Sequence, residues 1–413
     1  MEHKQSFFQR IGKDKRYIVF NLFFAYFTLG VALIMLGSVL PVLKADYALN
    51  YQVGGMLLSV QSIGYAVAGL GAGFLPLYLG LKKSFILLTS GTCIGMGMLL
   101  ASGNPVWLLT AMGLIGISKG AVTNYNNQIM TELAEGDAGP LNLMHAFFAI
   151  GACIAPFIVL LCGKVDASGW RLAVFLSAAA VGVGLLAMFR MNMRGNTAKQ
   201  EQNTEQNTEK TGVSYGFFKE KIFWITMLIC FFYQGIEGTM MGWLTSFFVD
   251  SHAMTDSFAQ VVTSALWIAL LIGRVSCSRL AARFKPSQMI LAMAIGQFVF
   301  LTVLVTSHSF AGMMIATIGL GLSMSGMYGT SVSNAGDLFA RYPVCMGFFV
   351  LMTSTGAVVA PAVVGAVANA SGMRMGISCL LFAATALVLM ALGNVRMGYL
   401  RRRRAKKANK QHA

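Results

Sequence analysis

The fold of this chain is decided by one apolar stretch that carries a carboxylate, Phe231-Phe232-Tyr233-Gln234-Gly235-Ile236-Glu237-Gly238. It lies inside the apolar run 222–249, which exceeds the roughly 20 residues that a helix needs to cross a bilayer. Glu237 is the only acidic residue well inside any apolar run, and a carboxylate there costs about 2.5–3.5 kcal/mol or more unless it is paired, protonated or hydrated. Glu237 therefore either has a function or is a protonated group that is hydrogen-bonded between helices.

The composition predicts an all-α membrane protein. Hydrophobic residues make up 56% of the chain and charged residues 11%, against about 25% charged in soluble domains. The 45 glycines suit helices that pack closely in lipid. The seven cysteines are scattered without metal-ligand spacing, so we expect neither a metal nor a cofactor. The first apolar run is too long for a cleavable signal peptide.

Twelve apolar runs of spanning length are predicted. They are 17–43, 51–79, 84–102, 105–131, 141–162, 170–190, 222–249, 257–281, 287–306, 309–336, 343–369 and 373–393. With the N-terminus in the cytoplasm, 25 of the 31 Lys and Arg residues lie on the cytoplasmic side and four lie outside. This asymmetry predicts that both termini are cytoplasmic.

The runs group into two six-helix bundles, residues 1–191 and 222–395. The segment 192–221 is polar, repeats Gln-Asn-Thr-Glu, and is expected to be a disordered cytoplasmic linker. The basic tail 396–413 is interpreted as an anchor near anionic lipid, so the net charge of +16 does not indicate nucleic-acid binding.

The two halves resemble each other in sequence. The motif Gly-Ala-Cys-Ile-Ala-Pro at 151–156 recurs as Gly-Ala-Val-Val-Ala-Pro at 356–361, which is 205 residues later. Gly113 matches Gly319 at an offset of 206. Duplicated bundles of this kind are typical of secondary transporters, whose solute sites lie near the bilayer midplane between the repeats.

The loop after the second run, residues 73–83, reads Gly-Phe-Leu-Pro-Leu-Tyr-Leu-Gly-Leu-Lys-Lys, and 278–285 is a degenerate second copy of it. The spacing of this stretch resembles the signature loop of the major facilitator superfamily. Leu77 replaces the usual Asp and Tyr78 the usual Arg, which departs from the charge latch of these loops. The resemblance implies twelve transmembrane helices in two bundles related by pseudo-two-fold symmetry.

Three further stretches carry a narrower resemblance: Gly116-Ile-Ser-Lys-Gly120 followed by Asn127, Asn142-Leu-Met-His145-Ala-Phe147, and Tyr233-Gln-Gly-Ile-Glu237 leading to Trp243. In these stretches the chain resembles the fucose/glucose–proton symporters of that superfamily. The resemblance implies a sugar–proton symporter. The chain departs from it at Thr123, where the family tends to carry an acid associated with proton coupling, and has Lys119 one turn earlier.

The candidate site follows from the cavity-lining spans of this superfamily, which are the first, fourth, seventh and tenth. Glu237 is the predicted proton carrier. The predicted substrate-binding residues are Lys119, Thr123, Asn124, Asn127, His145, Tyr233, Gln234, Trp243 and Tyr328. Glu237 and Lys119 both lie about 20 Å into their spans. Lys119 therefore pairs with Glu237, binds an anionic substrate or reaches toward an interface. Part of the amide cluster at 124–128 is expected to join helices instead.

The leading hypothesis is a secondary active transporter that moves a small polar solute, a sugar, polyol or sugar acid, by alternating access and with proton coupling. The alternatives are efflux of amphipathic compounds or organic anions, which the 27 methionines would suit, and a non-transporting receptor on a transporter fold. No pattern indicates an enzyme. We expect a monomer in the bacterial inner membrane, with the solute, H⁺ and the lipid bilayer as its partners.

Overall fold

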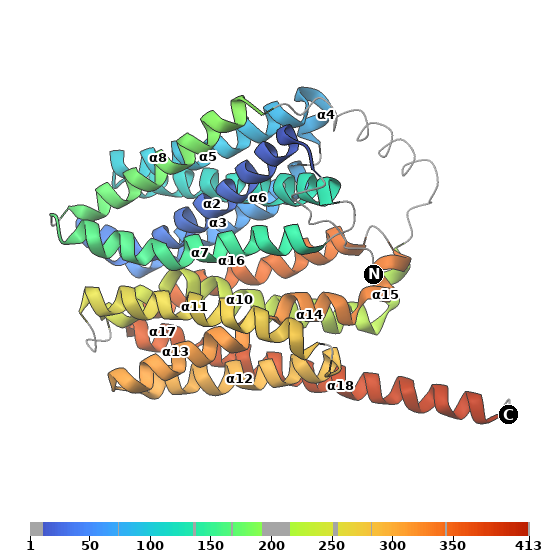
Figure 1. Ribbon diagram of the computed structural model, residues 1–413. Coiled ribbons are helices and arrows are strands. Elements are labelled where there is room, and N and C mark those ends of the chain that lie inside the picture. The colour runs from blue at the N-terminus through green and yellow to red at the C-terminus, as the bar shows by residue number, and fades with distance from the viewer. Residues whose placement is uncertain are drawn as a thin grey trace. The chain divides into compact units, whose positions relative to one another are not determined.

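The computed structural model describes residues 11–72, 74–134, 138–166, 168–191, 215–250, 255–281, 283–342 and 345–411. By its internal contacts the chain divides into two compact units, unit 1 (residues 1–212) and unit 2 (residues 213–413). The described regular elements of both units are helices, as Figure 1 shows. Residues 192–214 of the expected linker lie outside the described residues.

Unit 1 is a bundle of long helices with one short connecting helix. The helices are α2 (Lys13–Asp46), α3 (Tyr51–Gly71), α4 (Leu75–Leu79), α5 (Leu81–Ala101), α6 (Pro105–Ala134), α7 (Ala138–Gly163) and α8 (Gly169–Phe189). If the short α4 is not counted, α2 is the first helix of the unit. It packs against the fifth and sixth helices, which are α7 and α8. The fourth, α6, packs against α3 and α5, and α5 also packs against α8.

Unit 2 repeats this packing with helices of its own. They are η1 (Gly216–Lys219), α10 (Lys221–Asp250), α11 (Asp256–Leu280), α12 (Pro286–Thr306), α13 (Phe310–Met324), α14 (Met327–Asn334), α15 (Gly336–Arg341), α16 (Cys345–Ser371), α17 (Met373–Ser378) and α18 (Leu380–Gln411). Helix α10 packs against α16 and α18, α13 packs against α11 and α12, and α12 also packs against α18. These are the same pairings in the same order as in unit 1, so the predicted duplication is confirmed in the packing.

A glycine at the same place in each half lets two helices touch backbone to backbone. A Cβ added to Gly151 of α7 would lie 2.1 Å from the carbonyl oxygen of Phe27 in α2. A Cβ added to Gly356 of α16 would lie 2.0 Å from the carbonyl oxygen of Phe231 in α10. These glycines are the first residues of the motif that recurs 205 residues later. The sequence repeat therefore marks the closest helix crossing of each unit's first and fifth spans, and small residues are what such crossings require.

A second pair of crossings obeys the same offset. A Cβ on Gly116 of α6 would lie 2.0 Å from the carbonyl oxygen of Gln61 in α3. In unit 2, a Cβ on Gly321 of α13 would lie 2.6 Å from the carbonyl oxygen of Leu266 in α11. Gly321 lies 205 residues after Gly116, and Leu266 lies 205 residues after Gln61. Close packing of the second span on the fourth is thus also duplicated.

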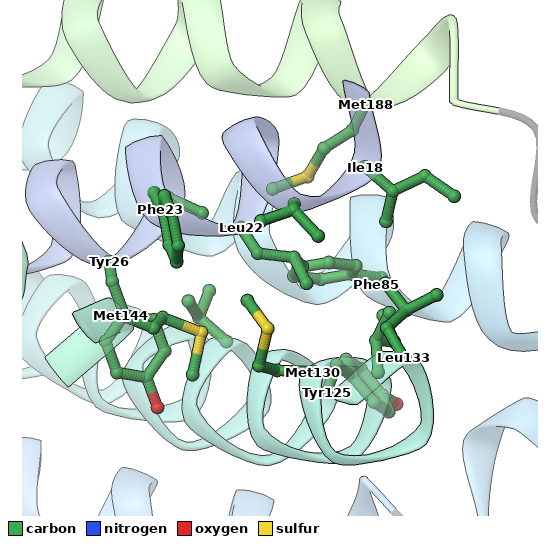
Figure 2. Packing of buried hydrophobic residues seen from close by; sticks show 14 of the residues in the cluster. Ile18, Leu22, Phe23, Tyr26, Phe85, Tyr125, Met130, Leu133, Met144 and Met188 are labelled. Carbon is green, nitrogen blue, oxygen red and sulfur yellow. The ribbon is translucent and has the colours of Figure 1, made fainter. Parts of the chain in front are cut away.

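An apolar cluster fills the space between α2, α5, α6 and α7 in unit 1. Leu22, Phe85, Met130 and Met144 are each at most 1% exposed, and they gather around one another in Figure 2. Tyr26 lies at the edge of this cluster and is also buried. Its ring belongs to the apolar core, so the core fixes where its hydroxyl can reach.

Local signals fix several helix ends. The Asn50 side chain accepts a hydrogen bond from Val53 N at 2.9 Å at the start of α3, and Ser309 Oγ accepts one from Gly312 N at 3.1 Å at the start of α13. Ser309 thereby separates the ninth and tenth spans, which only three residues connect. In the signature loop, Lys82 Nζ donates to the Phe189 carbonyl oxygen at 2.7 Å in the last turn of α8, where a cation is favoured.

Three predicted runs are each divided between two helices: 51–79 between α3 and α4, 309–336 between α13 and α14, and 373–393 between α17 and α18. The tenth run, 309–336, is expected to be one helix, but it is divided between α13 and α14 at Ser325 and Gly326. Ser325 Oγ bonds back to the Leu322 carbonyl oxygen at 2.8 Å, and a glycine follows at once, so the helix loses its regular continuation there. The last span continues as α18 to Gln411, because Arg, Lys and Ala of the tail are good helix formers.

Eleven helices of the described residues are long and apolar enough to cross a membrane. The remaining expected span is α3, a helix of 21 residues, which is about 32 Å long and matches the hydrocarbon thickness. The prediction of an all-α, multi-pass membrane protein is confirmed.

Candidate functional site

One side of α6 carries three predicted site residues. Lys119, Thr123 and Asn127 follow one another at four-residue spacing, which places them on one side of the helix, and all three are half-buried. Lys119 lies 14 residues from the start of α6 and 15 from its end, so it is about 21–22 Å from either end. Thr123 Oγ1 donates to the Lys119 carbonyl oxygen at 2.8 Å, which leaves its oxygen lone pairs able to accept.

Tyr26 of α2 joins this side of α6 to α7. Its hydroxyl lies 2.9 Å from Asn127 Oδ1 and 3.3 Å from the Thr123 carbonyl oxygen, and it has one proton to donate to either. The His145 imidazole of α7 stands edge-on to the Tyr26 ring with 5.1 Å between centroids. Asn127 and His145, predicted separately, are therefore brought together by a residue that the candidate set lacked.

The other amides of α6 have different surroundings. Asn126 is fully buried, and its Nδ2 donates to the Leu22 carbonyl oxygen of α2 at 3.0 Å. It joins two helices, as expected for part of this cluster. Asn124 is exposed on unit 1, and Gln128 Nε2 donates to Glu132 Oε1 at 3.2 Å near the end of the helix. Among these amides, Asn127 contacts the Tyr26 hydroxyl, and it lies on the same side of α6 as Lys119.

Lys119 has an aromatic neighbour in α3. Its Nζ lies 4.8 Å from the centroid of the Tyr65 ring, within the range of a cation–π interaction. Tyr65 is half-buried, and it lies close enough to Tyr26 for the two hydroxyls to interact electrostatically. Tyr65 therefore links the ammonium to the cluster around Asn127. Sequence reasoning did not find it, because a tyrosine in the second span gives no signal of its own.

Glu237 lies in the middle of α10. It is 16 residues from Lys221 and 13 from Asp250, which places it about 24 and 20 Å from the two ends of the helix. Tyr233, one turn earlier and 3% exposed, donates its hydroxyl to Glu237 Oε1 at 2.7 Å. Arg274 of α11 is half-buried and close enough to Tyr233 to interact with it electrostatically. The predicted pair Tyr233 and Glu237 is thus in direct contact, with a cation nearby.

The remaining candidates of unit 2 sit in packed surroundings. Trp243 is fully buried, and its Nε1 donates to the Pro361 carbonyl oxygen of α16 at 3.3 Å, so it joins α10 to α16. Tyr328 of α14 packs against Phe349, with 6.1 Å between ring centroids. Gln234 is half-buried beside Tyr233. In the described part of the chain, no group of three His, Cys, Asp or Glu residues is arranged to hold a metal ion.

Two repeated units of membrane-spanning helices, each with polar and ionisable side chains at mid-span, define a polytopic membrane protein of the transporter class. The Major Facilitator Superfamily matches this chain over residues 22–342, and the chain belongs to that superfamily. The superfamily expected from the signature loop is thereby confirmed, and the protein is a transporter of that superfamily.

Curated relatives are distant in sequence. The chain is 22% identical over 376 residues to the sodium-dependent glucose transporter 1A of Mus musculus, an alignment that covers 83% of this chain and 88% of the mouse protein. It is 22% identical over 273 residues to Bypass of stop codon protein 6 of Saccharomyces cerevisiae. That alignment covers 61% of this chain but only 54% of the yeast protein.

Solved structures share the fold. The crystal structure of a D-xylose-proton symporter matches with a TM-score of 0.72 and 14% identity, covering 92% of this chain and 97% of that one. The fucose:proton symporter of E. coli matches with a TM-score of 0.57 and 20% identity, covering 92% and 99%. At these sequence identities the likeness shows a shared fold alone.

Proposed function

We propose that this protein is a secondary active transporter that moves a small hydroxyl-rich solute, a sugar, polyol or sugar acid, together with a proton. The observation that carries the proposal is the hydrogen bond of 2.7 Å between the Tyr233 hydroxyl and the mid-span carboxylate of Glu237. An ionisable group at this depth is expensive, and in membrane proteins such groups mark ion and proton pathways.

The Tyr233 and Glu237 pair suits a carboxyl group that gains and loses a proton. When Glu237 is ionised, it accepts the phenolic proton, and this charge-assisted bond is stronger than a neutral one. When Glu237 is protonated, it can donate to the phenolic oxygen, which is an acceptor as well as a donor. Titratable or charged neighbours in unit 2 include Cys230, which interacts electrostatically with Glu237, and Arg274, which interacts electrostatically with Tyr233.

The solute class is supported by the side chains around Tyr26. Asn127 offers two donors and an acceptor, and His145 offers one donor and one acceptor when neutral. Hydroxyl groups of a sugar or polyol need both kinds of partner. The relatives and fold neighbours include proteins named as transporters of glucose, xylose and fucose, which agrees with this class.

The test is uptake into proteoliposomes that contain the full chain. A thermal-shift screen against sugars, polyols and sugar acids first identifies the solute. Uptake of that labelled solute is then measured with an imposed pH gradient, and separately with an imposed Na⁺ gradient because a mouse relative is named sodium-dependent. Counterflow, in which internal solute exchanges for labelled solute without any gradient, reports binding and movement alone.

Glu237→Gln is the decisive variant, because Gln resembles the protonated acid and cannot release a proton. We expect it to abolish accumulation driven by the pH gradient and to retain counterflow. Glu132→Gln is the matched control, since Glu132 is exposed near the end of α6, and it should accumulate solute like the parent. Full accumulation by Glu237→Gln, or accumulation that follows Na⁺ instead of pH, would refute proton coupling through Glu237.

A further inference from the structure

A small cavity lies inside unit 1, among side chains of helices α2, α5, α6 and α8. Its volume is about 10 Å³, and every residue that lines it is buried. Three of the lining residues are threonines, which are Thr28 of α2 and both Thr89 and Thr92 of α5. A cavity of this size holds one water molecule if polar groups are there to bind it. Whether it binds water therefore depends on what the three hydroxyls can offer.

Thr89 brings an unsatisfied hydroxyl to this cavity. The residue is 5% exposed, and its Oγ1 has no hydrogen-bond partner among the described residues. Leaving a buried hydroxyl without a partner is costly, and ordered water satisfies many such groups in folded proteins. Thr89 therefore points to a small polar molecule beside it.

The other two threonines have already used their protons. Thr28 Oγ1 donates to the Ala25 carbonyl oxygen at 3.1 Å, and Thr92 Oγ1 donates to the Ser118 hydroxyl at 2.7 Å. The Ser118 hydroxyl in turn donates to the Thr89 carbonyl oxygen at 3.1 Å, which fixes the direction of the bond from Thr92. Thr28 and Thr92 therefore keep oxygen lone pairs that can accept, whereas Thr89 keeps a proton that it can donate.

One water molecule is complementary to these three groups. It can donate its two protons to Thr28 and Thr92 and accept the proton of Thr89, which gives the three hydrogen bonds that a buried water typically makes. A cation suits the cavity less well. None of the lining residues, all of which the structure describes, is acidic, and apolar side chains such as Val122 and Val181 form the rest of the wall. A charge without an opposite partner is expensive in such surroundings.

We propose that this cavity is the binding site of one structural water molecule, which hydrogen-bonds Thr28 of α2 to Thr89 and Thr92 of α5. The water connects the first span of unit 1 to the third, and both of these helices also pack against α8. The site is separate from the residues around Asn127 and Glu237. It is therefore independent of the solute and of proton coupling.

The second unit has different side chains at the equivalent places. Gln297 of α12 lies 205 residues after Thr92. Its Nε2 donates to the Ser323 carbonyl oxygen of α13 at 3.3 Å, and a glutamine reaches further than a threonine. Ala294 lies 205 residues after Thr89 and has no hydroxyl that needs a partner. Unit 2 thus has a longer amide side chain where unit 1 has a threonine beside a cavity, which agrees with a water in unit 1.

Radiolytic labelling tests the site in the full chain. A pulse of X-rays in H₂¹⁸O splits bound water into hydroxyl radicals, which oxidise a neighbouring methionine to its sulfoxide, and mass spectrometry detects the ¹⁸O. Met188 lines the cavity and is only 3% exposed, so contact with bulk water does not account for its labelling. Met130 is the internal control, because it is fully buried and is not among the residues that line the cavity. We expect Met188 to be labelled and Met130 to stay unlabelled.

Three variants separate the water from other causes of labelling. Thr89→Val keeps the shape of the side chain and removes its hydroxyl, so it should abolish the labelling of Met188. Thr92→Gln copies the residue of unit 2, fills the cavity and should have the same effect. Thr110→Val is the control, since Thr110 is exposed on α6, and it should label like the parent. Melting temperatures show whether each variant is folded.

A structure of the parent that resolves ordered water provides the second measurement. It should contain one water within hydrogen-bond distance of Thr89 Oγ1. A well-resolved cavity without that water, equal labelling of Met188 and Met130, or labelling of Met188 that survives Thr89→Val would each overturn the inference. The melting temperature is also compared in Na⁺ and in K⁺. Stabilisation by Na⁺ that Thr89→Val removes would assign the cavity to a cation and would overturn the inference as well.

Discussion

Replacing Gly151 by Ala should destabilise unit 1 by an amount set by one close contact. The added Cβ would lie 2.1 Å from the Phe27 carbonyl oxygen, whereas real Cβ contacts essentially never fall below 3.0 Å. Helices α2 and α7 must therefore move apart by about 0.9 Å at their crossing. Forcing extra volume into a packed interior costs about 1–3 kcal/mol. At roughly 2–4 °C per kcal/mol for a unit of this size, the melting temperature should fall by about 2–12 °C.

The assay is thermal unfolding of the purified full chain in detergent, followed by the exposure of buried thiols. Gly356→Ala makes the equivalent change in unit 2, where the Cβ would lie 2.0 Å from the Phe231 carbonyl oxygen, and it should show a similar loss. Gly182→Ala is the control, because nothing lies within 4 Å of its added Cβ and Ala is the better helix former. If Gly151→Ala melts at or above the temperature of Gly182→Ala, the backbone contact does not exist as described.

Two further predictions concern the site and the topology. Asn127→Ala should weaken solute binding by about 1–3 kcal/mol, because a solute hydroxyl then loses its hydrogen-bond partner, and Tyr26→Phe and His145→Ala should also weaken it. Calorimetry against the identified solute checks this, with folded yield as the control, and parental affinity in all three variants would place the solute elsewhere. Cysteines introduced near Lys164 should react with an impermeant thiol reagent added to intact cells, and a cysteine near Gln202 should not. Labelling near Gln202 would overturn the assignment of cytoplasmic termini.

Most of the fold was predictable from the sequence, because the bilayer imposes a length and a composition on every span. Glu237 is conspicuous for the same reason, since polarity inside an apolar run is rare. The break at Ser325 and Gly326 was not predictable in this way. A run of apolar and small residues has the same hydropathy whether it is one helix or two, and the break depends on a side-chain hydrogen bond that hydropathy does not report.

The candidate site was predictable in part. Four-residue spacing alone places Lys119, Thr123 and Asn127 on one side of α6, because helix periodicity is a local property of the sequence. Tyr26 and Tyr65 were missed because their roles depend on how α2 and α3 are rotated against α6, which is a long-range property. Trp243 shows the opposite limit: an indole at mid-span suits a sugar or a helix crossing equally well, and its hydrogen bond to α16 is visible only in three dimensions.

The joining of α2 to its neighbours has a kinetic consequence. Gly151 locks α2 to α7 at the backbone, and Asn126 ties α6 to the Leu22 carbonyl oxygen. Tyr26, Asn127 and His145 are mounted on these three helices, so we expect them to travel as one rigid body during the transport cycle. A solute would then meet the same hydroxyl and amide partners from either compartment. In that case the half-saturation concentrations for influx and efflux should be alike once the driving gradient is removed, and the direction of net flow would be set by the solute and ion gradients together.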